Sequence, residues 1–121
     1  IIVAVTDIFF YKKIRDDFLP HGHKLESLRT GDDWQTKALQ SKPMGIIINM
    51  NDDRLNATDI LKSLKALPQT QSLPILAFAN HEEVGTWKLA KDLGIHKIVS
   101  RNEFSARTLA LFDEITAPAA S

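Results

Sequence analysis

The sequence contains no cysteine among its 121 residues. This absence excludes disulfide bonds, thiolate metal sites and cysteine nucleophiles. Its 15 basic residues are balanced by 15 acidic ones, so no net charge favours binding to nucleic acid or to an anionic membrane. No apolar run approaches the roughly 20 residues that a membrane-spanning helix needs. We therefore expect a cytoplasmic protein that binds neither nucleic acid nor membrane through this domain.

Recognisable catalytic motifs are also missing. No Gly-x-Gly-x-x-Gly turn follows the first apolar run, which argues against dinucleotide binding. The histidines, His21, His23, His81 and His96, lie in separate segments without the spacing of metal ligands, and surface or packing roles are their expected ones. We therefore expect no enzymatic activity, no metal and no other cofactor. Because the chain begins without an initiator methionine or a signal peptide, we also expect a domain of a longer protein.

What the sequence does contain is a regular alternation of apolar runs and helical segments. The expected strands are residues 1–6, 23–28, 45–50, 73–78 and 95–99. The expected helices are residues 8–19, 30–40, a segment that starts at Asn56 or Thr58 and includes Leu67, residues 82–93, and residues 102–115 with Asn102 as the cap. Strands that are each followed by a helix imply right-handed crossovers and a parallel sheet covered on both faces. Residues 1–116 then form one domain, and residues 117–121 a frayed tail or the start of a linker.

Asn49 is the most informative single residue. It ends the run Gly45-Ile46-Ile47-Ile48, which is typical of a parallel strand buried on both faces. In open α/β sheets, ligands and chemistry lie at the carboxyl ends of such strands. A carboxylate at this place could hold a metal or accept a phosphoryl group, but an asparagine side chain is uncharged and a poor nucleophile. The sequence thus predicts a site position without its reactive group.

Several segments, in their order and spacing, resemble the receiver domain of bacterial two-component response regulators. They are Gly31-x-x-Trp34-x-x-Lys37-Ala38-Leu39 before Lys42-Pro43, Ser72-Leu73-Pro74-Ile75-Leu76-Ala77-Phe78-Ala79, and Ala90-Lys91-Asp92-Leu93-Gly94-Ile95. The resemblance covers residues 1 to about 115. It implies a flavodoxin-like (CheY-like) α/β fold, a doubly wound five-stranded parallel sheet with strand order 2-1-3-4-5 and helices on both faces.

The resemblance places the family's phosphorylation pocket at Thr6, Asp7, Asn49, Ala79 and Arg101. In the family, the positions of Thr6 and Asp7 hold two acidic residues, and the position of Asn49 holds the phosphoacceptor aspartate. The position of Ala79 holds a hydroxyl residue, and that of Arg101 holds a lysine. Only Asp7 matches, and Arg101 keeps the positive charge with a different geometry. One carboxylate and one amide oxygen make a poor magnesium site, and phosphoryl transfer without the ion loses its main charge stabiliser. The pattern indicates a degenerate pseudo-receiver, in which magnesium binds at most weakly at Asp7 and is not expected.

Acidic residues just beyond Asn49 keep a second function open. Asp52 or Asp53 could act as a shifted phosphoacceptor in an active receiver, although such a cluster is more typical of a solvated loop that leads into a helix. A weaker third possibility is a flavodoxin-like domain that binds a small ligand in the same crevice. Our main expectation is an interaction module of two-component signalling that acts independently of phosphorylation.

The expected interaction surface is formed by the fourth helix, the fifth strand and the fifth helix. In receivers this surface is commonly used for dimers and partners, as the resemblance implies. Here it would contain Trp87, Lys91, Ile98 and Leu111. Tryptophan is enriched among interface hot spots, although a half-buried packing role is the alternative for Trp87. The expected partner is a signalling protein, an attached output domain or a second copy of the chain.

Overall fold

The structure is a computed structural model, and it describes residues 1–5, 7–27, 36, 45–51, 57–66, 68, 73–80, 82, 84–95 and 97–116. The strands are β1 (Ile2–Ala4), β2 (Glu26–Ser27), β3 (Ile46–Asn49), β4 (Ile75–Ala79) and β5 (Lys97–Ser100). The helices are α1 (Ile8–Phe18), the short 3-10 helix η1 (Leu19–His21), α3 (Ala57–Ala66), α4 (Val84–Asp92) and α5 (Arg101–Thr116). Of the expected second helix, residues 30–40, only Thr36 lies within the described part, and the expected tail, residues 117–121, lies outside it.

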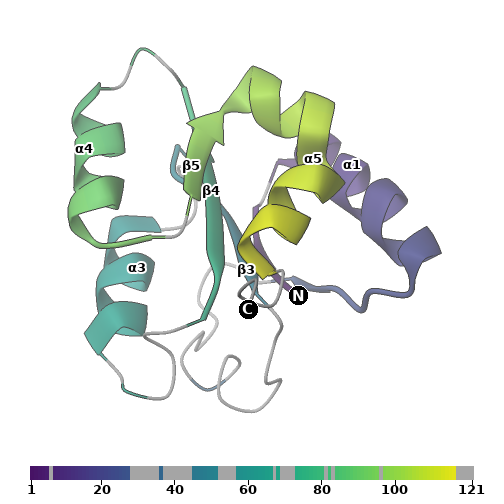
Figure 1. Cartoon of the computed structure of the whole chain (residues 1–121), viewed down its shortest axis with the longest axis horizontal. Helices are drawn as coiled ribbons and strands as arrows, with labels where there is room; N and C mark the ends of the chain where they lie inside the picture. Colours follow the sequence, from purple (N-terminus) through teal and green to yellow (C-terminus); the bar gives the residue numbers. More distant parts are fainter. Residues whose placement is uncertain are drawn as a thin grey trace.

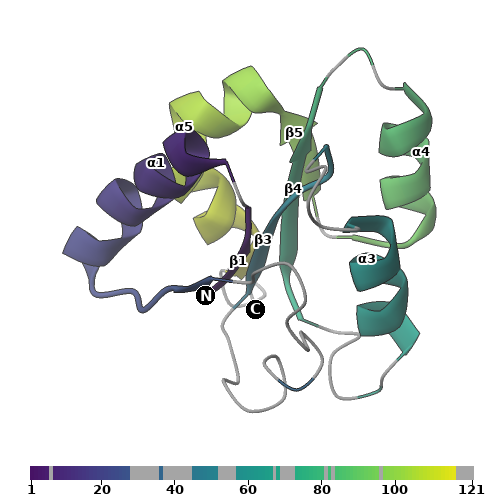
Figure 2. The same cartoon turned by 180° about the vertical axis from the view of Figure 1, so that it is seen from behind.

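The strands form one parallel sheet in the order β2-β1-β3-β4-β5. In Figure 1 the sheet stands between two layers of helices, with α3 and α4 on one face and α1 and α5 on the other. The view from behind in Figure 2 shows the same two layers. This arrangement confirms the predicted fold class, strand order and coverage of both faces.

The central strand β3 is buried on both sides because its side chains alternate between two cores. Ile46 and Ile48 pack in the cluster that includes residues of α3 and α4, whereas Ile47 packs in the cluster that includes residues of α1 and α5. The exposed fraction of each of these side chains is 2% or less. Burial of such a side chain contributes about 1.5–3 kcal/mol, so this apolar run accounts for the position of β3 at the centre of the sheet.

The ends of two helices show how the sequence fixes their starts and stops. The chain leaves α1 through η1 and then Gly22, whose φ of 83° is in the left-handed region that glycine favours. At α5 the prediction of Asn102 as the cap was wrong. The Ser100 hydroxyl oxygen accepts a hydrogen bond from the Glu103 backbone N–H at 3.1 Å, because β5 runs directly into the helix.

Helix α5 is interrupted at Arg107, whose backbone angles of φ −134° and ψ 34° are not helical. At the next residue, the buried Thr108 hydroxyl donates to the Phe104 carbonyl at 2.6 Å, a contact that often bends helices. On the exposed side, the Arg107 guanidinium contacts the Glu103 and Glu114 carboxylates at 3.0 and 2.8 Å. Side-chain contacts therefore hold both halves of α5 around the kink.

Candidate functional site at the carboxyl ends of the strands

The predicted pocket residues that the structure describes gather at one edge of the sheet. Asp7 follows β1, Asn49 ends β3, Ala79 ends β4 and Arg101 follows β5. Parallel strands carry their carboxyl ends to the same edge, which is why positions so far apart in the sequence meet. Thr6 lies outside the described residues.

Asp7 is the predicted pocket residue with a carboxylate, and this carboxylate has structural partners. Its Oδ1 atom caps α1 by accepting hydrogen bonds from the backbone N–H groups of Phe9 at 2.9 Å and Phe10 at 3.3 Å. Its Oδ2 atom lies 3.8 Å from an Arg101 guanidinium nitrogen. Both ionic side chains are more than one third exposed, so the pair itself contributes at most about 1 kcal/mol. The carboxylate is thus used to start a helix and to orient Arg101.

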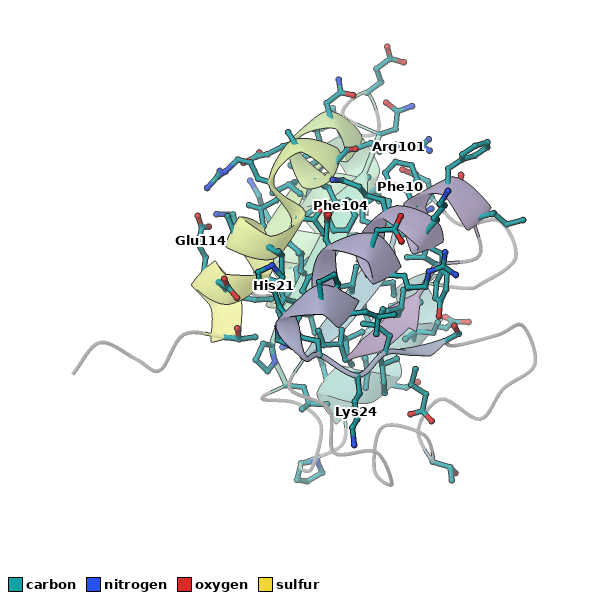
Figure 3. All side chains as sticks on the ribbon, turned by 90° about the vertical axis from the view of Figure 1, so that its right-hand side faces the viewer. Phe10, His21, Lys24, Arg101, Phe104 and Glu114 are labelled. Atoms are coloured by element: carbon teal, nitrogen blue, oxygen red, sulfur yellow. The ribbon has the colours of Figure 1, made fainter. Side chains whose placement is uncertain are left out.

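A stack of aromatic rings fills the α1–α5 layer beside this edge. The rings of Phe10 and Phe78 lie 4.9 Å apart, those of Phe78 and Phe104 lie 4.2 Å apart, and both pairs are stacked. The Arg101 guanidinium carbon lies 4.7 Å from the centre of the Phe10 ring, close enough for a cation–π contact. Figure 3 shows Arg101, Phe10 and Phe104 together near the starts of α1 and α5.

Sequence reasoning missed this stack. The sequence feature that could have revealed the stack is the apolar run Ile8-Phe9-Phe10, directly after the helix cap Asp7. Consecutive helical residues point about 100° apart, so the three cannot all face the core. Phe10 turns inward onto the stack, whereas the exposed fractions of Ile8 and Phe9 are 79% and 86%. These two apolar side chains therefore project into solvent beside the candidate site.

Asn49 is buried, with 6% of its surface exposed, and its side chain shapes the following turn. The Oδ1 atom accepts a hydrogen bond from the Asn51 backbone N–H at 2.9 Å, the typical contact of an asparagine turn. Ala79, in the next strand, is fully buried and has no hydroxyl group. Neither residue offers a nucleophile, and Ala79 offers no donor for a phosphoryl oxygen.

Among the described residues, the side chains at the strand ends do not fit a magnesium ion. Within the described ranges, no group of three or more histidine, aspartate or glutamate side chains could hold a metal. Asp7, the carboxylate of the predicted pocket, is committed to a helix cap and to Arg101. Magnesium demands near-ideal octahedral oxygen coordination, usually with one or two carboxylates. Asp52 and Asp53, the alternative acidic positions, lie outside the described residues.

The two histidines within the described residues, His21 and His23, are a surface residue and a packing residue. His21 in η1 is exposed, and the His23 ring packs edge-on against Phe18, with ring centres 5.3 Å apart. His81 and His96 lie outside the described residues.

The predicted interaction surface is only partly assembled. Trp87 and Ile98 are half-buried and pack against the core cluster on the α3–α4 side, while Lys91 is exposed. The Trp87 indole N–H donates to the Asn80 carbonyl at 3.1 Å. The placement of Leu111 on this surface was wrong. Leu111 is fully buried in the α1–α5 cluster.

The position of Leu111 follows from the spacing of buried residues along α5. Phe104, Thr108, Leu111 and Phe112 recur at helical intervals and form its inward face. The outward apolar residue that sequence reasoning overlooked is Val84, at the start of α4, whose exposed fraction is 73%. We call Val84, Trp87, Lys91 and Ile98 the α4–β5 surface.

No helix in the described part of the chain has both the length and the apolar character required to cross a membrane.

Solved structures with the same fold come from bacterial signalling proteins. The receiver domain of NtrX from Brucella abortus is 14% identical with a TM-score of 0.79, and the alignment covers 98% of each chain. A signal receiver domain of a signal transduction histidine kinase from Syntrophus aciditrophicus is 10% identical with a TM-score of 0.83, over 98% of this chain and 90% of that one. Chemotaxis protein CheY4 of Vibrio cholerae is 15% identical with a TM-score of 0.80, over 94% of this chain and 95% of that one. No protein-family model and no curated protein matches the sequence. At such low identity the similarity shows the fold.

Proposed function

We propose that this chain is a pseudo-receiver, a domain of bacterial two-component-type signalling that binds a protein partner independently of phosphorylation. The observation that carries the proposal is Asn49. It stands at the end of the central strand, where the resemblance places the phosphoacceptor, yet it is buried and its oxygen holds a turn. The fold shared with bacterial receiver domains supports the signalling context.

The chemistry of the site supports the absence of phosphoryl transfer. An amide is a poor nucleophile, and Asp7 is the carboxylate at the strand ends within the described residues. Phosphoryl transfer relies on positioning and on metal charge, and the donor set described above fits no magnesium ion. We accordingly propose a cytoplasmic binding domain without enzymatic activity or cofactor, one that contacts neither nucleic acid nor membrane.

The α4–β5 surface supports protein binding. Val84, Trp87 and Lys91 follow one another at helical spacing, so they share one side of α4, and Ile98 lies on the adjacent strand. An exposed valine next to a half-buried tryptophan and a lysine provides apolar area with a charged rim, the usual composition of an interface. The proposed partner is a signalling protein, an attached output domain or a second copy of the chain.

A phosphodonor assay tests the proposal. The protein is incubated with acetyl phosphate and magnesium, and its intact mass is measured beside a receiver that has its acceptor aspartate. We expect the mass to stay unchanged while the control gains one phosphate. A gain of one phosphate that disappears in Asp52→Asn or Asp53→Asn would establish the alternative, a receiver with a shifted acceptor.

A further inference from the structure

Three asparagines connect the site at the strand ends with helix α4, two of them through side-chain oxygens and the third through its backbone. The Asn49 Oδ1 atom accepts from the Asn51 backbone N–H at 2.9 Å. The Asn51 Oδ1 atom accepts from the Asn80 backbone N–H at 2.5 Å, across 29 positions of sequence. The Asn80 backbone carbonyl accepts from the Trp87 indole at 3.1 Å. We call Asn49, Asn51 and Asn80 the asparagine ladder.

The ladder ties two loops and one helix to each other. Asn49 and Asn51 shape the turn after β3, which is also held to β4 by the hydrogen bond from the Met50 N–H to the Phe78 carbonyl at 3.0 Å. Asn80 begins the loop after β4, and its Oδ1 atom accepts from the Glu82 N–H at 3.2 Å, which shapes that loop as well. The hydrogen bond from the Trp87 indole to the Asn80 carbonyl then connects the middle of α4 to the same loop. The path from strand end to helix is continuous.

Every bond in this path is made by neutral groups that belong to the chain. The acceptors are amide or peptide carbonyl oxygens, and the donors are backbone or indole N–H groups. None of them requires a metal, a phosphoryl group or a particular protonation state. The hydrogen bonds that reach Trp87 are therefore all supplied by the chain itself.

We infer that Asn51 and Asn80 are positioning residues that hold Trp87, and with it the α4–β5 surface, in one fixed arrangement through contacts of the chain itself. Asn51 provides the contact between the two loops, and Asn80 passes it to Trp87. We call this restraint of Trp87 by Asn51 and Asn80 the clamp. The role of the surface in partner binding rests on the proposed function, whereas the clamp itself does not.

The chemistry of the ladder predicts which substitutions it tolerates. Asn51→Asp keeps an oxygen at the same distance along the side chain, and this oxygen can still accept from the Asn80 N–H. Asn51→Ala removes the acceptor and leaves that N–H without its partner in the turn after β3. Asn51→Gln keeps the amide but displaces it by one methylene group, which makes it a second disruptive variant that retains a polar side chain.

The readout is the exchange of the Trp87 indole hydrogen with water, measured by nuclear magnetic resonance. The sequence has two tryptophans, Trp34 and Trp87, so Trp87→Phe assigns the signal. We expect Asn51→Ala and Asn51→Gln to speed the exchange roughly five-fold, the change that corresponds to one net hydrogen bond. Asn51→Asp should behave like the unmodified protein, and Asn102→Ala, at an exposed asparagine of α5, is the matched control.

The backbone amide of Ile47 separates a local effect from a general loss of stability. Ile47 is fully buried in the central strand, so its amide exchanges mainly through global unfolding. Faster exchange of the Trp87 indole alone supports the clamp. Unchanged indole exchange in Asn51→Ala and Asn51→Gln, or equal acceleration at Ile47, overturns it.

Partner association of the same variants separates this inference from the proposed function. If indole exchange rises and association weakens in Asn51→Ala, the clamp controls the surface. If association is unchanged while the indole exchanges faster, the control of binding by the ladder is overturned. Phosphorylation in the mass assay would overturn the proposed function and leave the measured clamp unaffected.

Discussion

Asn49→Asp restores the acceptor side chain of receivers in a setting that does not suit it. The substitution is isosteric, and the Asn51 N–H, 2.9 Å from the present Oδ1 atom, can donate to the new carboxylate. The position is only 6% exposed, however, and Arg101, the positive group of the predicted pocket, is already paired with Asp7. The new charge would therefore be largely desolvated and supported by one backbone donor.

Desolvation raises the pKa of a buried carboxyl group, so Asn49→Asp should destabilise the protein at neutral pH. A rise of one to two pKa units corresponds to a loss of about 1.4–2.7 kcal/mol in the free energy of unfolding at pH 7. Because the folded-state pKa is the higher one, this loss is present above the folded pKa. It disappears as the pH falls through the unfolded value of about 3.9, where both states are protonated.

Urea unfolding of the two proteins at pH 7 and near pH 4 measures this loss. Asn102→Asp is the matched control, since it adds the same charge at an exposed position and should change stability by no more than about 0.5 kcal/mol. We also expect acetyl phosphate and magnesium to leave the mass of Asn49→Asp nearly unchanged, because Ala79 offers no hydroxyl and Asp7 is engaged. Stability equal to that of the unmodified protein at pH 7, or efficient phosphorylation, would refute this reasoning.

Further predictions concern packing, binding and pH. Gly45→Ala should lower the free energy of unfolding by about 1–3 kcal/mol in thermal denaturation, because the added Cβ would lie 2.9 Å from ring carbons of Phe112; an unchanged melting temperature would contradict the close packing. Val84→Glu should weaken self-association or partner capture in light scattering or pull-down assays and leave stability within about 0.5 kcal/mol, whereas equal binding would place the interface elsewhere. The hydrogen bond from Lys97 lowers the pKa of Glu114, so its contribution to stability is present above the unfolded pKa and lost as the pH falls through the folded one. The stability difference between the unmodified protein and Glu114→Gln should therefore vanish in acid, and a difference that persists there would contradict the ion pair.

Val84 is a cleaner probe of the interface than Trp87. The tryptophan packs against the core and holds the loop after β4, so Trp87→Ala would remove structural contacts as well as surface. We therefore expect Trp87→Ala to lower the stability of the fold, since Trp87 is half-buried and donates a hydrogen bond. Val84 is mostly exposed, and a change in binding on its substitution reports on the surface itself.

The sheet was predictable because its signals are local. The run Ile46-Ile47-Ile48 indicates burial on both faces whatever surrounds it, and the alternation of strands with helices requires parallel pairing. The strand order came from the resemblance, since periodicity alone does not specify which strands are neighbours. The start of α5 was misplaced by two residues because both Ser100 and Asn102 are good caps, and only the register of β5 decides between them.

The placement of the candidate residues at one edge was predictable, but their contacts were not. The resemblance placed Asp7, Asn49 and Arg101 at one edge, as the parallel strands require. The stacking of Phe10 on Phe78 and the hydrogen bond from Asn80 to Asn51 join distant segments and leave no periodic trace in the sequence. Leu111 was misassigned for a related reason, because a helical pattern identifies a buried face without telling what covers it.

The two roles of Asp7 have an evolutionary consequence. Its carboxylate caps α1 and contacts Arg101, and both contacts preserve the fold without any phosphoryl chemistry. Selection for folding alone can therefore retain an acidic residue that would otherwise be taken as a trace of catalysis. Among homologues without an acidic residue at position 49, we expect position 7 to keep aspartate or to change to serine, threonine or asparagine, the other side chains that start helices.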